Sequence, residues 1–416
     1  MFILEAGAFP CKALTVTRLD AIVIGGGVSG TAFAFHAARS GRRVLLLERE
    51  ERFGGCLHTE RGPGDFWFEL GAHTCYNSYG AFIEMLEGCG LMGSLQPRAK
   101  PVLRFLDGDR VLPGSNLGLL VRQMDKLELL RFLPHAFGAR QDGQTVRSYY
   151  SSLVGPTNYE RVLGPMLSAV PSQKADDLPA DMLFKKRPRR KDVIRSFTLR
   201  GGLQRVCEAA ASTPGVTARR GAPVEAVTKT ATGYAVTLAD GAREEARVVA
   251  IATPPGAAAG LLREGMPEIA GRLARIRETS ADTLAVVLRR EKAARIPPST
   301  FLIPRSDAFF SVVTRDVVPD PTFRAFTFHF RAGQSADDRM RRATRLLGVE
   351  PRDLDAAVER RAVLPSPVVG HRDIVADLDR TLEGGELALT GNWFGGLSIE
   401  DCVQRSRAEW ERVSKV

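Results

Sequence analysis

The sequence has no long hydrophobic run. Its nearest approach, residues 21–38, is interrupted by Ser29, Thr31 and His36 and by a glycine cluster. A membrane-spanning helix needs about 20 consecutive, predominantly apolar residues. We therefore expect no transmembrane span.

Cysteines are few, and their spacing is not that of a metal site. No CxxC pair occurs among the six, which are Cys11, Cys56, Cys75, Cys89, Cys207 and Cys402. In a chain of this length, such usage indicates reduced thiols in a cytoplasmic protein. We expect no structural zinc and no other metal site.

The first residues lack the pattern of a signal peptide. Between Met1 and Thr17, Glu5 precedes any basic cluster and Pro10 interrupts the segment. A signal peptide needs a basic start followed by an apolar core. We expect an unstructured or added leader here.

The chain does have the length and composition of an ordinary globular protein. Its 416 residues are 44% hydrophobic and 25% charged. These values predict two or three domains and exclude a disordered or fibrous chain. The formal net charge of +10 is compatible with nucleic acid, anionic lipid or an anionic substrate as a partner.

A glycine-rich turn lies between a predicted strand and a predicted helix. Leu19–Ile24 is short, apolar and β-branched, and Gly25, Gly27 and Gly30 follow it in GxGxxG spacing before a helical stretch to Ser40. Such glycines allow a tight turn, close approach of a pyrophosphate, and close helix packing. The alternative is a βαβ unit without a nucleotide.

The continuation favours the dinucleotide. Residues 43–47 predict a second buried parallel strand, and Glu48 follows it. An acid at this point holds ribose hydroxyls and disfavours a 2′-phosphate. A second glycine pair, Gly54-Gly55, and the segment Phe66–Gly71 are not required by a plain nicotinamide-binding unit, which favours FAD.

With these motifs the sequence resembles the flavin amine oxidase superfamily, and within it the protoporphyrinogen oxidase branch. The resemblance recurs in Leu199–Leu203, in Ala246–Pro255, and in a C-terminal segment that includes Gly391-Asn392, Gly395-Gly396 and Asp401-Cys402. It implies an FAD-dependent enzyme. A helix predicted from about Ser398 would present its N-terminus to the flavin and stabilise negative charge on the reduced ring.

The resemblance also implies the fold and the domain limits. We expect an α/β protein with a discontinuous, Rossmann-like FAD-binding domain over residues 18–93, 195–262 and 366–416. Residues 94–194 and 263–365 would form a substrate domain with a mixed, helix-covered sheet. In it, residues 117–168 have helical spacing, whereas residues 283–288, 309–314 and 324–330 alternate like strands. A hairpin is expected from residues 233–238 and 246–251, around Asp240-Gly241.

The motifs and the resemblance together assign the cofactor-binding residues. They are Gly25, Gly27, Val28, Ser29, Gly30, Glu48, Arg49, Gly54, Gly55, Cys56, Gly71, Ala72, His73, Val224, Thr253, Gly391, Asn392, Gly396, Leu397 and Ser398. Trp393 and Phe394 are candidates for the wall of a substrate cavity, with core packing as the alternative. FAD is expected to bind noncovalently, and no side chain is assigned as catalytic.

Two departures from the family pattern bear on the substrate. Amine oxidases of this superfamily usually carry a lysine near flavin N5, and residues 278–288 contain none. The porphyrinogen branch commonly has an arginine shortly after the Glu69-Leu70-Gly71 turn, and residues 72–82 contain none. The missing lysine favours the porphyrinogen branch over amines, whereas the missing arginine departs from that branch. A tetrapyrrole is the first candidate, a polyene or other secondary metabolite the second, and an amine the third. A flavin-containing binding protein without turnover is the alternative of another class.

A run of cations stands out in residues 185–191, with six in seven positions. A solvated loop is one interpretation; the others are anionic lipid, a carboxylated substrate and RNA. No aromatic residue is interleaved, which disfavours stacking on nucleic acid. We expect a small apolar substrate as partner, peripheral membrane contact as an option, and no nucleic acid.

Overall fold

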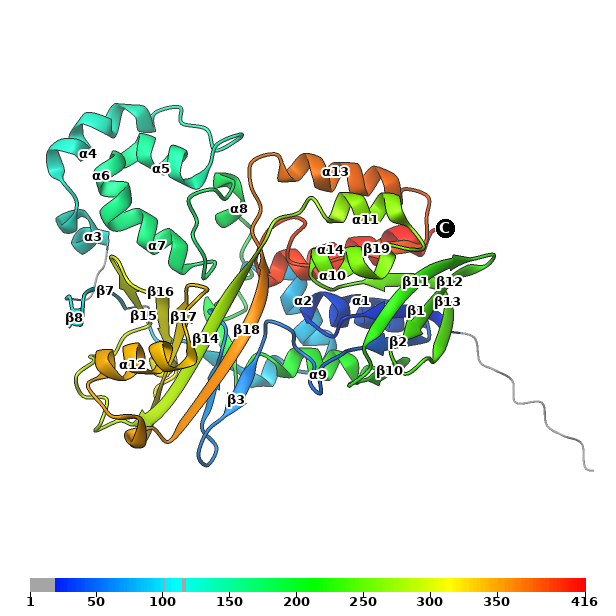
Figure 1. Ribbon diagram of the computed structural model, residues 1–416, viewed down its shortest axis with the longest axis horizontal. Helices are drawn as coiled ribbons and strands as arrows, with labels where there is room; N and C mark the ends of the chain where they lie inside the picture. The colour runs from blue at the N-terminus through cyan, green and yellow to red at the C-terminus, as the bar shows by residue number, and fades with distance from the viewer. Residues whose placement is uncertain (1–18, 101, 114–116) are drawn as a thin grey trace, which may run out of the picture.

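In the computed structural model, the molecule is built around two large β-sheets (Figure 1). The structure describes residues 19–100, 102–113 and 117–416, so the predicted leader lies outside the described residues. No described helix is long and apolar enough to cross a membrane. The five described cysteines are free thiols.

The first sheet is built mainly from parallel strands. In spatial order they are β10 (Val216–Arg219), β2 (Val44–Leu47), β1 (Leu19–Ile24), β13 (Arg243–Ile251), β12 (Gly233–Leu238) and β11 (Val224–Thr230), and β19 (Leu387–Leu389) also pairs with β13. β12 pairs antiparallel with both β11 and β13, and the others pair parallel. Parallel strands covered on both faces are expected to be apolar, as β2 is throughout and β1 is from Ala21 to Ile24.

Helices cover both faces of this sheet. Ala21 and Val23 of β1 pack on one side with α1 (Val28–Arg39), α2 (Gly80–Gly88), α9 (Arg205–Ala211) and α14 (Ile399–Val413). Ile22 and Ile24 pack on the other side with α10 (Pro255–Leu262), α11 (Pro267–Leu273) and α13 (His371–Leu382). The alternation of β1 side chains between two hydrophobic clusters is what a strand buried on both faces requires.

The second sheet is mixed and lies beside the first (Figure 1). Its order is β18 (Ala356–Pro365), β14 (Glu278–Arg289), β17 (Phe323–Phe330), β16 (Phe309–Thr314), β15 (Phe301–Pro304), β7 (Leu103–Asp107) and β8 (Arg110–Val111). Leu284 and Val286 of β14 pack with α12 (Ala336–Leu347) on one face. Ala285 and Val287 pack with Phe66, Phe68 and Leu70 on the other.

Two smaller sheets join these parts. One pairs β3 (Thr59–Arg61) with β4 (Trp67–Glu69), and the other has the order β5 (Cys75–Tyr76), β9 (Ser196–Leu199), β6 (Leu95–Pro97). Because the β3–β4 hairpin continues the glycine-rich segment of the first sheet and packs on β14, it fixes the two large sheets against each other.

A helical region lies at one end of the second sheet, drawn in cyan to green in Figure 1. It contains α3 (Leu117–Gln123), α4 (Lys126–Phe132), α5 (Val146–Val154), α6 (Pro156–Asn158), α7 (Gly164–Ala169) and α8 (Ala180–Leu183), and a π-helical turn, Tyr159–Leu163, connects α6 to α7. Short 3-10 turns lie at Met92–Ser94, Leu133–Ala136, Arg315–Val317 and Pro351–Asp353.

The α/β fold, the strand–turn–helix unit, the β12–β13 hairpin and the helix after Ser398 are confirmed. The strands expected around residues 283–288, 309–314 and 324–330 are also present. The domain limits remain a prediction.

Candidate active site

The turn between β1 and α1 allows only glycine at two of its positions. Gly25 has φ +107°, and a Cβ there would lie 2.8 Å from the carbonyl oxygen of Ala252. A Cβ on Gly30 would lie 1.8 Å from the carbonyl oxygen of Gly25. The tight turn and the close helix packing predicted for these glycines are therefore confirmed.

The carboxylate of Glu48 lies at the end of β2 and orders this turn. Its Oε2 accepts a hydrogen bond from the backbone N–H of Gly26 at 2.6 Å, and its Oε1 accepts one from Glu50 at 2.8 Å. The residue is 8% exposed. Besides the predicted contact with a ribose, Glu48 thus has a structural role that the sequence did not reveal.

The second glycine motif, Gly54-Gly55, lies directly beside the glycine-rich turn between β1 and α1. The N–H of Gly54 donates to the carbonyl of Gly26 at 2.8 Å, and Gly27 and Gly54 form an isolated bridge. A Cβ on Gly55 would lie 3.0 Å from the Cα of Gly27. Side chains at these positions would fill the space between the two loops.

These surroundings fit the ADP part of a dinucleotide. Helix α1 begins after Gly27 with no side-chain cap, so its first N–H groups have no side-chain acceptor, and such an N-terminus binds phosphate. Ala222, which leads into β11 and Val224, donates its N–H to the carbonyl of Glu48 at 2.9 Å. A Cβ on Gly25 would lie 3.4 Å from Cγ2 of Thr253, so Thr253 adjoins the turn, whereas the contact predicted for Val224 remains a prediction.

Three other predicted residues of this region have different surroundings. Val28 is half-buried, Ser29 is buried and its carbonyl accepts a hydrogen bond from Ser406 at 2.8 Å, and Arg49 is exposed. Their direct contact with a cofactor remains a prediction.

A cavity of about 670 Å³ opens next to this loop, between the second sheet and the helical region. That volume is in the usual range for small-molecule sites. Seven of the predicted cofactor residues line it, namely Cys56, Gly71, Ala72, His73, Asn392, Leu397 and Ser398. The structure thus brings the N-terminal and C-terminal motifs to one cavity.

Strands of the second sheet supply an apolar floor. Ala281 and Thr283 of β14, Ala362 and Leu364 of β18, and Ile303 of β15 line the cavity. The sequence showed these positions only as parts of strands, because their shared face depends on the pairing of distant strands.

The C-terminal segment contributes a capped helix end and an ion cluster. Ser398 caps α14: its Oγ accepts the N–H of Asp401 at 3.2 Å, and Asp401 accepts the N–H of Ser398 at 3.3 Å. Lys185 and Arg187 each lie 2.8 Å from Oδ1 of Asp401. Burial alone would raise the pKa of the Asp401 carboxyl, but hydrogen bonds from Lys185 and Ser398 outweigh it and lower that pKa.

This cluster adds to the predicted role of the α14 N-terminus. The Ser398 cap binds the N–H of Asp401 in the first turn of the helix, and two cations, Lys185 and Arg187, face the Asp401 carboxylate. Any negative charge that develops here would be stabilised by side-chain cations as well as by the helix end.

The expectation that Trp393 and Phe394 wall the cavity needs correction. Trp393 is 0% and Phe394 4% exposed, both belong to a core cluster of the first sheet, and neither lines the cavity. Their rings stack with centroids 3.8 Å apart. Glycine at Gly391 permits this packing, since a Cβ there would lie 2.5 Å from Trp393 Nε1, whereas a Cβ at Gly396 would lie 2.5 Å from Asp401 Oδ2 in the ion cluster.

Three histidines line the cavity, and all are held neutral. Burial lowers the pKa of His73 to about 4 and that of His329 to about 4. Burial, with Arg52 and Arg360 nearby, also lowers the pKa of His58. His73 was predicted from its place after Gly71; the other two escaped prediction because no sequence motif marks them.

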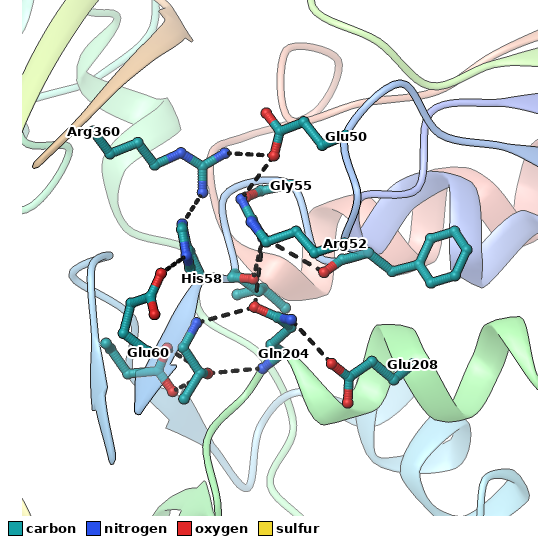
Figure 2. Close-up of polar contacts among 12 residues, drawn as sticks. Glu50, Arg52, Gly55, His58, Glu60, Gln204, Glu208 and Arg360 are labelled. Atoms are coloured by element: carbon teal, nitrogen blue, oxygen red, sulfur yellow. Dashed lines mark hydrogen bonds and ion pairs between the residues drawn. The ribbon is translucent and has the colours of Figure 1, made fainter. Parts of the chain in front are cut away.

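His58 belongs to a polar network that joins the two sheets (Figure 2). Arg360 of β18 donates to its Nδ1 at 2.5 Å, so the ring proton lies on Nε2, which donates to Glu60 at 2.6 Å. Arg360 also lies 3.6 Å from Glu50, which lies 3.1 Å from Arg52. Arg52 donates to the carbonyl of Gly55 at 3.0 Å. The second sheet is thereby connected to Gly54-Gly55.

The family profile described as flavin containing amine oxidoreductase matches residues 28–295 of this chain. Human protoporphyrinogen oxidase is 25% identical over 346 residues, covering 69% of this chain and 70% of that protein. Zebrafish (Danio rerio) all-trans-retinol 13,14-reductase is 47% identical over 55 residues, covering 13% of this chain and only 9% of that protein.

A solved structure shares the fold over nearly the whole chain. The crystal structure of an Exiguobacterium sp. 255-15 protein, described as a protoporphyrinogen oxidase, has a TM-score of 0.78 at 19% identity. The match covers 96% of this chain and 99% of that one.

Proposed function

Because the chain belongs to the flavin containing amine oxidoreductase family and is an FAD-dependent oxidoreductase, we propose that it oxidises or desaturates a largely apolar, conjugated substrate. FAD is held without a covalent bond, and its binding residues are those predicted from the motifs. When bound, it supplies the hydride-accepting chemistry.

The charge of the cavity wall is the observation from which we infer the substrate class. Asp401 is the only carboxylate among the described residues that line the cavity, and Lys185 and Arg187 already bind it. A protonated amine would find no free carboxylate and several cations. Lys185 is the lysine that lines the cavity among the described residues. Its ammonium group binds Asp401 of α14, and Lys185 lies in none of the strands that form the cavity floor. This arrangement disfavours amines and suits an apolar ring or chain.

A porphyrinogen is the first candidate. The supporting observations are the similarity to human protoporphyrinogen oxidase over 69% of this chain and the apolar floor of the cavity. A polyene is the second candidate, favoured by the 47% identity to a retinol reductase over a short segment.

The chain's own residues contribute position and charge to the reaction. The floor holds the apolar substrate, His58 is fixed in one tautomer by two partners, and the cluster around Asp401 stabilises negative charge at the C-terminal side.

Peripheral membrane contact completes the proposal. Leu127, Leu130, Leu133 and Phe137 of the helical region are 80%, 64%, 52% and 86% exposed. Lys126 directly precedes Leu127 in the sequence, and Arg131 lies between Leu130 and Leu133. Apolar side chains with interspersed cations suit the surface of an anionic bilayer.

The test is anaerobic reduction of the purified, FAD-loaded protein. We expect a porphyrinogen or a polyene to bleach the flavin spectrum, air to restore it with formation of peroxide, and benzylamine to have no effect. Bleaching by benzylamine alone would overturn the proposal. Acid precipitation checks the binding mode, since noncovalent FAD stays in the supernatant.

A matched pair of variants ties the reaction to the cavity. Ala362→Trp fills the floor and should abolish reduction while FAD is retained. Val363→Trp alters the neighbouring residue, which is 44% exposed and does not line the cavity, and should leave reduction unchanged.

A further inference from the structure

The cavity wall has an excess of positive charge. Among the residues that the structure describes, its lining cations are Lys185, Arg187, Arg189, Arg195 and Arg360, against the single carboxylate of Asp401. The three histidines that line it have lowered pKa values and add no charge at neutral pH.

Three of these five cations already have acidic partners. Lys185 and Arg187 bind Asp401, and Arg360 lies beside Glu50. Arg189 and Arg195 differ from them: both are exposed, both line the cavity, and neither has an acidic partner within the described part of the chain. An unpaired arginine at the edge of an apolar cavity is available to an anionic group of the ligand.

The backbone between these two arginines is fixed by Asn77, which is 8% exposed. Its side-chain Nδ2 donates to the carbonyls of Arg190 at 2.9 Å and Val193 at 3.3 Å. Its own carbonyl accepts the N–H of Arg190 at 2.8 Å, and its N–H donates to the carbonyl of Arg195 at 3.1 Å. Asn77 therefore holds the residues next to Arg189 and Arg195 at the edge of the cavity.

Neighbouring cations in the same segment are arranged differently. Arg190 pairs with Glu87 at 2.8 Å and with Asp192 at 2.5 Å. Lys186 and Lys191 are exposed and do not line the cavity. Of the cations that line the cavity from this part of the chain, Lys185 and Arg187 are bound by Asp401, which leaves Arg189 and Arg195 without an acidic partner among the described residues.

We propose that Arg189 and Arg195 bind a carboxylate on the substrate, so that the enzyme takes an amphipathic acid with its apolar body on the floor of β14 and β18. This inference rests on the proposed function and specifies its substrate class. The planar guanidinium matches a carboxylate in two-point geometry, and an apolar cavity next to it leaves the charged end at the edge.

Matched probes on the FAD-loaded protein test this proposal. Each acid is compared with its neutral counterpart: oleate with methyl oleate, retinoate with retinol, and mesoporphyrin with its dimethyl ester. Binding is followed by perturbation of the flavin spectrum and by calorimetry. We expect at least one acid to bind about 10-fold or more tightly than its counterpart, the gain typical of one charge-assisted hydrogen bond.

Two double variants with equal loss of charge locate the effect. Arg189→Ala with Arg195→Ala should abolish the preference for the acid, whereas Lys186→Ala with Lys191→Ala should retain it. FAD content should equal that of the wild type in both, which excludes contact of these arginines with the cofactor phosphates. The preference should also weaken as salt is raised, because exposed charges are screened within about 10 Å at 0.1 M.

Three results would overturn the proposal: equal affinity for each acid and its counterpart, a preference that survives loss of both arginines, or no binding of any acid to the loaded protein. None of these is the failure of the proposed function. That function fails when neither acids nor neutral compounds of this apolar, conjugated kind reduce the flavin, whatever their affinity.

Discussion

The glycine-rich loop of the first sheet and the cavity face of the second sheet are built in opposite ways. In the loop, Glu48 binds Gly26 from 22 residues away, and each partner belongs to one strand–turn–helix–strand unit. On the cavity face, Arg360 reaches His58 across 302 residues and Lys185 reaches Asp401 across 216. Local sequence therefore specifies the loop predicted to bind the nucleotide, whereas strand pairing between distant segments specifies which residues line the cavity.

The largest effect should come from a change in the loop itself. Gly30→Ala places a Cβ 1.8 Å from a backbone oxygen, and since backbone cannot move aside cheaply, we expect a loss of about 3 kcal/mol in the free energy of unfolding. Denaturant unfolding of the protein measures it.

The control for that variant is another helical glycine. A Cβ added to Gly260 of α10 would meet no atom within 4 Å, so Gly260→Ala should be neutral or stabilising by about 0.5 to 1 kcal/mol. Equal destabilisation by the two variants would contradict the packing role of Gly30.

The next effect concerns the cofactor. Glu48→Gln removes the charge from a carboxylate that accepts two backbone N–H groups and is predicted to hold ribose. A charge-assisted hydrogen bond is worth about 1.5 to 3 kcal/mol, so FAD affinity should fall roughly 10- to 150-fold. Fluorescence titration of the apoprotein with FAD measures this.

Glu51→Gln is the matched control, because Glu51 is an exposed acid three residues further along the same loop. It should retain wild-type affinity. Unchanged affinity in Glu48→Gln as well would remove the dinucleotide from this loop.

The same contrast explains which parts of the site the sequence could predict. The turn at Gly25, the acid at Glu48 and the helix after Ser398 follow from short-range patterns, and all are present. The apolar floor, His58 and Arg360 could not be predicted, since residues on one sheet face are brought together only by register. Trp393 and Phe394 were misjudged for a related reason: their position beside a cofactor motif does not tell which side of the sheet they face.

The free energy of unfolding should depend on pH through Glu69, in the hairpin that connects the two regions. Glu69 ends the β3–β4 hairpin and accepts the N–H of Leu203 at 2.7 Å. Burial raises its pKa to about 7. Because the folded protein then binds this proton more tightly than the unfolded chain, Glu69 lowers stability as pH rises from about 4.5 to 7.

Glu69→Gln should remove that loss, which is on the order of 1 to 3 kcal/mol. Unfolding free energies at pH 5 and pH 8 should then differ less than in the wild type. Asp65→Asn, at an exposed acid of the same hairpin loop, should leave the difference unchanged, and a Glu69→Gln protein with the wild-type pH dependence would contradict the raised pKa.

The smallest effect sharpens the comparison at the contact between the two regions. After burial and Arg52, Arg360 is a further cause of the lowered pKa of His58. Arg360→Met removes that charge, so the pKa of His58 should rise toward its ordinary value of 6.5, while FAD binding persists because the loop is intact. An NMR titration of the histidine signals, assigned with His58→Gln, measures this pKa directly.

Arg361→Met is the matched control, because it changes the next residue, whose side chain binds Asp282 at 2.7 Å instead. It should leave the pKa of His58 unaffected. A His58 pKa unmoved by loss of Arg360 would mean that the second sheet does not influence the glycine-rich loop through this contact.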